Sequence, residues 1–93
     1  MNREQLRRLL IERLCAAYAA VEDESAAHAG HAGARQGGGG HYRICVAAAC
    51  FEGLGRLERH RRVYDALAAE MKTEIHALAI RALTPSEWNR EKR

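Results

Sequence analysis

Histidines are the side chains of this sequence best suited to specific chemistry. His28, His31 and His41 fall within or just after a stretch rich in alanine and glycine, where three imidazoles could converge on one metal ion. The pattern is a weak indication, because zinc sites normally have four well-spaced ligands that often include paired cysteines. His76 stands near the start of a segment expected to form a strand. Taken alone, it is better explained as a histidine at a sheet margin with a backbone partner.

Arginines form the second candidate group. Four of them lie in a glycine-containing turn and the helix expected after it: Arg56, Arg59, Arg61 and Arg62. Guanidinium groups bind phosphates and carboxylates through paired hydrogen bonds, so the group could contact nucleic acid or an acidic partner. A solvated helix face is the common alternative. The net charge of +3 permits phosphate binding without requiring it, because acidic residues nearly match basic ones.

Catalytic motifs and paired thiols are missing from the sequence. There is no glycine-rich phosphate loop before a helix, no nucleophile elbow and no H-E-x-x-H pattern, so we expect no enzymatic activity. The three cysteines lack C-x-x-C spacing, and we expect them to be reduced. Cys15 and Cys45 are expected to be small packing residues, and Cys50 to be the most exposed.

The length of the chain predicts one domain, residues 1–93. Apolar residues make up 47%, but alanine supplies much of this share and aromatic residues only 5%, so the core should be thin. No apolar stretch approaches the roughly 20 residues of a membrane-spanning helix. We therefore expect a cytoplasmic protein that does not contact membranes.

The first half of the chain predicts a helix and two strands. A possible capping box at Asn2 and Gln5 precedes leucines at helical spacing, which predicts an amphipathic helix. Residues 19–25 suggest an edge strand. Residues 26–40 end in four glycines and predict a flexible loop within a hairpin. The alternation of apolar residues over 42–46 predicts the second strand.

The second half predicts a helix, a strand and a short final helix. Apolar residues at spacings of three and four from Leu57 to Met71 predict the second main helix, and residues 75–82 are apolar enough for a strand. Residues 84–87 form a capping box with proline at the first helical position. The expected order is helix, strand, strand, helix, strand, helix. This predicts an α+β fold in which helices cover one face of a three-stranded sheet.

Several short motifs together resemble the signature of the BolA family. They are Phe-Glu-Gly at 51–53, Arg-His-Arg-Arg-Val-Tyr at 59–64, Ile-His-Ala-Leu-Ala-Ile at 75–80, Leu-Thr-Pro at 83–85, and Trp88. Upstream, Glu-Ser at 24–25 and His-Tyr-Arg at 41–43 fit the hairpin of the same family. The resemblance covers nearly the whole chain, and it is specific because the motifs occur together.

The resemblance implies a fold like the second class of KH domains and a monothiol glutaredoxin as partner. The two proteins would share a [2Fe-2S] cluster with glutathione, and no cofactor is expected in the isolated chain. The family position of the C-terminal ligand matches His76. The second ligand position matches His28, with His41 as the competing candidate. The resemblance also leaves open a DNA-binding transcriptional regulator that uses the four arginines.

The hairpin loop departs from the family pattern at two places. Ala26 and Ala27 stand where many relatives have glycines, and His31 and the four-glycine run change the length or shape of the loop. The second ligand therefore stays open among His28, His31 and His41. No cysteine stands at the hairpin position, so the chain resembles the histidine-type branch of the family.

Overall fold

The computed structural model describes residues 1–25 and 40–92. In chain order the elements are α1 (Arg3–Leu14), β1 (Tyr18–Asp23), β2 (His41–Ala47), the 3-10 turn η2 (Ala49–Phe51), α3 (Arg56–Ala66), α4 (Ala68–Thr73), β3 (Ala77–Leu83) and α5 (Pro85–Glu91). The fold is of the α+β class, and the predicted order is confirmed except that the second main helix is divided. The likeness to KH domains stays a prediction. Residues 26–39 of the predicted flexible loop lie outside the described residues.

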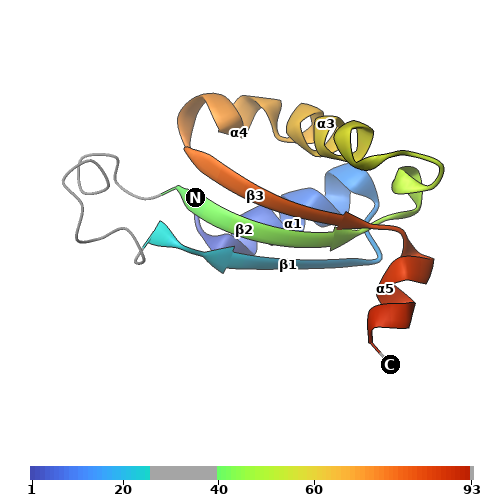
Figure 1. Ribbon diagram of the computed structural model, residues 1–93. Helices are drawn as coiled ribbons and strands as arrows, with labels where there is room; N and C mark the ends of the chain where they lie inside the picture. Colours follow the sequence, from blue (N-terminus) through green and yellow to red (C-terminus); the bar gives the residue numbers. More distant parts are fainter. Residues whose placement is uncertain (26–39, 93) are drawn as a thin grey trace.

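The three strands form one mixed sheet in the order β1-β2-β3 (Figure 1). β1 runs antiparallel to β2, with Val21 opposite Ile44. β2 and β3 run parallel, with Ile44 opposite Ile80. The predicted edge position of the first strand is confirmed, and β3 forms the other edge.

Helices cover one face of this sheet, as predicted. α1 packs against β1 and α3, and α3 packs against β3. The side chains that face these helices are buried in the first two strands, among them Ala19, Ile44 and Val46. They pack with residues from the helices and connections, namely Leu6, Leu10, Leu14, Phe51, Val63, Leu67 and Ile75. Burial of each large apolar side chain contributes about 1.5–3 kcal/mol, so this single layer supplies most of the stability.

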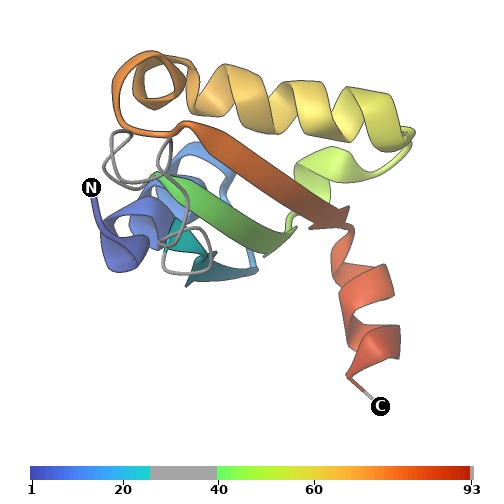
Figure 2. The same ribbon diagram turned by 60° about the vertical axis from the view of Figure 1, so that its left-hand side comes forward.

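α5 lies apart from this layer and projects beyond the end of β3 (Figure 2). Its capping box is confirmed, because Glu87 N donates to Thr84 Oγ1 at 3.2 Å and Thr84 N donates to Glu87 Oε1 at 2.8 Å. Trp88 stacks on Tyr18 of β1 with ring centroids 4.0 Å apart. The aromatic pair therefore holds the final helix against the opposite edge strand of the sheet. No helix within the described residues is long and apolar enough to cross a membrane.

The second main helix differs from its prediction. The helical pattern was expected to run unbroken from Leu57 to Met71, but α3 ends at Ala66 and α4 begins at Ala68. Leu67 between them is fully buried, whereas Leu57 in the first turn of α3 is 63% exposed. The helix bends at a leucine that enters the core, and a periodic pattern does not distinguish a bent helix from a straight one.

Candidate metal-ligand and basic sites

His76 lies directly before β3 and is exposed to solvent. Its backbone N donates to Gly40 O at 2.8 Å, and Ala77 N donates to the same oxygen at 3.1 Å. Within the described residues, the imidazole ring has no hydrogen bond or ion pair. Only the backbone of His76 has a partner in this part of the chain, so the ring is not held by a backbone group as the sheet-margin explanation requires, and its nitrogens remain available to a ligand from outside the fold.

Gly40 leaves the space in which the His76 ring lies. Its φ is +82°, and a Cβ built on it would stand 2.7 Å from His76 Cδ2 and 2.5 Å from Glu74 O. Any larger residue would collide with the ring and with the backbone before it. The glycine run predicted only a loop, because the contact between Gly40 and His76 joins two parallel strands and leaves no local trace in the sequence.

His41 begins β2, where it is partly buried and stands opposite Ala77. Its backbone extends the ladder to β1, since Glu24 N donates to His41 O at 2.7 Å. Because strand side chains alternate, His41 shares the face of Arg43, on the side away from α1 and α3. His41 thus begins β2 and His76 directly precedes the neighbouring strand β3. The two side chains are not placed on one face of the sheet.

The other predicted ligands lie outside the part of the chain that the structure describes. His28 and His31 belong to residues 26–39. Among residues 1–25 and 40–92, no group of three or more histidine, cysteine, aspartate or glutamate side chains could hold a metal ion.

Two of the cysteines, Cys15 and Cys50, differ from their predicted exposure, whereas Cys45 is partly buried as expected. Cys15 is exposed and ends α1 in the left-handed region, with φ of 52°. Cys50 is partly buried, with its Sγ 3.8 Å from Leu14 O. Burial raises the pKa of the partly buried Cys45 thiol. Cys15 thus lies at the end of α1 rather than in the core, and Cys50 lies close to the same helix end, beside Leu14 O.

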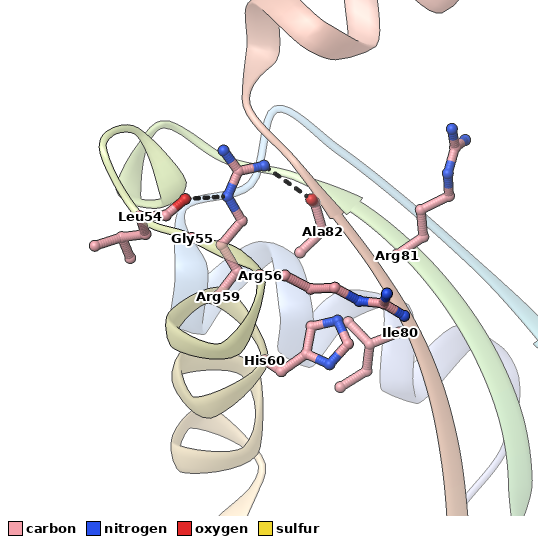
Figure 3. A pocket seen from close by; sticks show the side chains of 8 residues that line it. All are labelled: Leu54, Gly55, Arg56, Arg59, His60, Ile80, Arg81 and Ala82. Carbon is pink, nitrogen blue, oxygen red and sulfur yellow. Dashed lines mark hydrogen bonds between the residues drawn. The ribbon is translucent and has the colours of Figure 1, made fainter.

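Arg59 is the arginine of the predicted group that the fold itself uses. Its Nε donates to Leu54 O at 2.9 Å and its Nη1 to Ala82 O at 3.1 Å (Figure 3). Nη1 also donates to Glu87 Oε1 at 2.7 Å. The guanidinium therefore connects the turn before α3, the end of β3 and the first turn of α5.

The acidic partner of Arg59 is held in its charged form. The hydrogen bond from Arg59, followed by the backbone N–H of Thr84, lowers the pKa of Glu87 to about 2. The same carboxylate thus closes the capping box of α5 and receives the Arg59 guanidinium. Sequence spacing predicted the cap, but the ion pair joins residues 28 positions apart and was missed.

The remaining arginines of the group are exposed to solvent. Arg56, Arg61 and Arg62 are exposed, and Arg61 lies 3.5 Å from Glu58 one turn earlier on α3. A cavity of about 420 Å³ lies between the start of α3 and the end of β3, and Arg56 lines it together with His60. The structure therefore leaves three arginines on the surface. Arg56 lines this cavity, and Arg62 lines a second one, of about 330 Å³, beside the end of α1.

Known proteins resemble this chain in sequence and in fold. The BolA-like protein family profile matches residues 10–87. BolA-like protein 1 of Homo sapiens is 41% identical over 83 residues, which cover 89% of this chain and 58% of that protein. The DNA-binding transcriptional regulator BolA of Haemophilus influenzae is 34% identical over 71 residues, which cover 76% of this chain and 65% of that protein.

Solved structures of BolA proteins have a similar fold. The solved BolA domain of SufE1 from Arabidopsis thaliana matches with a TM-score of 0.77 and 36% identity, over 91% of this chain and 93% of that domain. The chain spans only 47% to 58% of the length of the mammalian BolA-like protein 1 sequences. The match over residues 10–87 includes both the His76 segment and the arginine group. The chain therefore belongs to the BolA-like family.

Proposed function

We propose that this chain is an adaptor that binds a monothiol glutaredoxin and co-ligates a [2Fe-2S] cluster through histidine, for iron–sulfur trafficking or for iron or redox sensing. The observation that carries the proposal is the exposed ring of His76, which has no polar partner within the described residues. A ligand from one protein to a cluster held partly by another must lie on the surface. His76 meets that requirement, and membership of the BolA-like family gives it a context.

The donor chemistry fits a cluster of this kind. A neutral imidazole can replace thiolate on one iron of a [2Fe-2S] cluster, which removes negative charge and raises the reduction potential. His76 would present its unprotonated nitrogen, and Gly40, which has no side chain, would leave room for the ring. Protonation of the imidazole competes with its binding to iron. The bond should therefore break more readily in acid than a bond from a buried structural ligand.

The remaining ligands must come from elsewhere, because the described residues offer no complete metal site of their own. In the proposed complex, the glutaredoxin and its glutathione give thiolates. The second ligand from this chain would be His28, His31 or His41. His41 is the one of these three that the structure describes, at the start of the strand next to β3.

The test is to mix the chain with a glutathione-loaded monothiol glutaredoxin that carries its cluster. We expect the visible absorption and circular dichroism of the cluster to change, and His76→Ala to abolish the change while the variant stays folded. His60→Ala is the matched control, because His60 is partly buried on α3 and lies outside this site. An unaltered spectral change in His76→Ala would overturn the proposal.

A second candidate function is sequence-dependent binding to DNA. The observation that favours it is the likeness to the H. influenzae protein named as a DNA-binding transcriptional regulator. Arg56, Arg61 and Arg62 would contact the duplex, whereas Arg59 would act indirectly because its guanidinium already connects three elements. A mobility shift with duplex DNA at physiological salt, repeated with Arg61→Ala and Arg62→Ala, tests this role. Binding that disappears with modest salt and ignores sequence would reduce it to charge attraction.

A further inference from the structure

The outer edge of β3 carries backbone groups that do not face β2. Leu83 O accepts a hydrogen bond from Ala48 N at 3.0 Å, which shows that Leu83 faces the neighbouring strand. In a parallel strand, the N–H and C=O of one residue point to the same side, and the side alternates from residue to residue. Leu78, Ile80 and Ala82 therefore direct their backbone groups away from the sheet.

One of these outward groups already has a partner. Ala82 O accepts the hydrogen bond from Arg59 Nη1, which is independent evidence that Ala82 faces outward. Between this edge and any residue in the described ranges, no further hydrogen bond is found. The N–H and C=O of Ile80 and the N–H of Ala82 thus remain available. An open edge of this kind is a template for pairing with another strand.

A basic cavity runs along this open edge. The cavity of about 420 Å³ contains no carboxylate in its lining, and its basic lining residues are Arg56, Arg59, His60 and Arg81. Figure 3 shows Arg56 and His60 reaching from α3 towards Ile80, whereas Arg81 points to the far side of β3. Arg59 and Arg81 are paired with carboxylates of α5. Arg56 has no ion pair with any residue that the structure describes.

From these observations we propose that the cavity binds an extended acidic peptide segment of a partner protein, which adds as a short strand to the outer edge of β3. The backbone of the peptide pairs with Ile80 and with Ala82 N–H, and a carboxylate side chain of the peptide meets Arg56. Arg59 closes the edge at Ala82 O, so the added strand is short. This site is separate from His76 and does not depend on a cluster.

A peptide explains both features of the site, and a nucleic acid explains one. Phosphates would pair with Arg56 and could accept from the outward N–H of Ile80, but they have no donor for its C=O. An added strand satisfies these backbone groups, and its side chains supply the charge that the cavity lacks. Strand addition also gives the partner a defined register along β3, which charge attraction alone does not give.

The experiment uses the isolated chain with ¹⁵N labelling and a fluorescent peptide of about six residues that alternates valine with aspartate, since strands of this length are common. We expect anisotropy to report binding and the amide signals of Ile80, Ala82 and Arg56 to shift. The same peptide with N-methyl groups on alternate amides should bind at least about tenfold more weakly, because one edge of the methylated peptide can no longer donate hydrogen bonds to β3. Ile80→Pro should weaken binding of the parent peptide similarly, since it removes an outward donor and spares the ladder to β2.

Matched arginine variants separate the site from general charge. Arg56→Ala should weaken peptide binding about tenfold, and Arg61→Ala, on the same helix but outside the cavity, should leave it unchanged. Equal binding of the methylated peptide, or equal losses in both arginine variants, would overturn the proposal, as would the absence of binding. Shifts at Arg56 with duplex DNA and none with the peptide would assign the cavity to nucleic acid instead. None of these outcomes involves glutaredoxin, so the function proposed above is tested separately.

Discussion

At the scale of single residues, the relation between Gly40 and His76 is the most specific feature of the structure. The ring of a proposed ligand lies where it does because the residue beside it has no side chain. Motif spacing identified His76, since the segment 75–80 carries the family pattern. Spacing did not identify Gly40 as a positioning residue, because the contact exists only once β2 and β3 pair in parallel.

Gly40→Ala is expected to destabilise the protein and to displace His76. The positive φ alone costs an alanine about 1–2 kcal/mol, and the overlaps with His76 Cδ2 and Glu74 O add to this cost. Urea unfolding measures the free energy, and the amide and ring signals of His76 report the displacement. In the proposed complex with glutaredoxin, the same variant should reduce the spectral change of the cluster.

Gly53→Ala is the control for this prediction. Gly53 has nearly the same φ, +78°, but a Cβ there would meet nothing within 4 Å. Gly53→Ala should therefore be destabilised only by the cost of placing an alanine at positive φ, and the His76 signals should stay unchanged. If the two variants were equally destabilised and His76 kept its signals in both, the close approach at Gly40 would have no role in positioning the ring.

At the scale of elements, the attachment of α5 depends on contacts that sequence patterns do not contain. The capping box and the proline at its start were predictable because they involve residues 84–87, which are local. The ion pair of Arg59 with Glu87 and the stacking of Tyr18 on Trp88 join distant segments. For the same reason, four arginines within seven positions looked equivalent in the sequence, although one of them connects three elements in the fold.

The ion pair of Glu87 predicts how stability depends on pH. The pKa of Glu87 is about 2 in the folded chain against an ordinary value of 4.5, so folding favours the charged form. The stabilising contribution is therefore complete above about pH 4.5 and is lost as the pH falls towards 2. Glu87→Gln should be less stable than the parent at pH 7, and the difference should shrink across this window. Urea unfolding at pH 7, 4 and 3 measures it, and a constant difference would contradict the assignment.

The aromatic pair predicts a local loss of order in α5. Tyr18→Ala should lower the free energy of unfolding by about 0.5–1.5 kcal/mol for the lost stacking, in addition to the loss from reduced apolar burial, and it should expose more of Trp88. Trp88 is the single tryptophan of the chain, so its fluorescence should shift to longer wavelength and the amides of α5 should exchange faster. Tyr64→Ala is the control, since Tyr64 is 39% exposed on α3. An unchanged emission in Tyr18→Ala would show that α5 is held by Arg59 without the stack.

At the scale of the whole molecule, one helical layer on a three-stranded sheet must supply the stability. The fold class, the one-sided cover and the edge strand were predictable, because the periods of the apolar residues decide which faces must be buried. The candidate ligand set stays a prediction, since the described residues do not form a complete metal site and His28 and His31 lie outside them. A site that needs a second protein cannot be completed from one sequence.

The thin core makes the cost of losing one leucine side chain depend strongly on its place. Leu67 is fully buried at the junction of α3 and α4, whereas Leu57 is 63% exposed, although the sequence placed both on one apolar stripe. Leu67→Ala should cost about 2–5 kcal/mol, a large part of the 5–15 kcal/mol typical of a domain, because it removes buried area and leaves a cavity. Leu57→Ala should change the free energy by about 0.5 kcal/mol or less. Urea unfolding of the two variants measures this directly, and equal losses would mean that α3 and α4 do not bend into the core at Leu67.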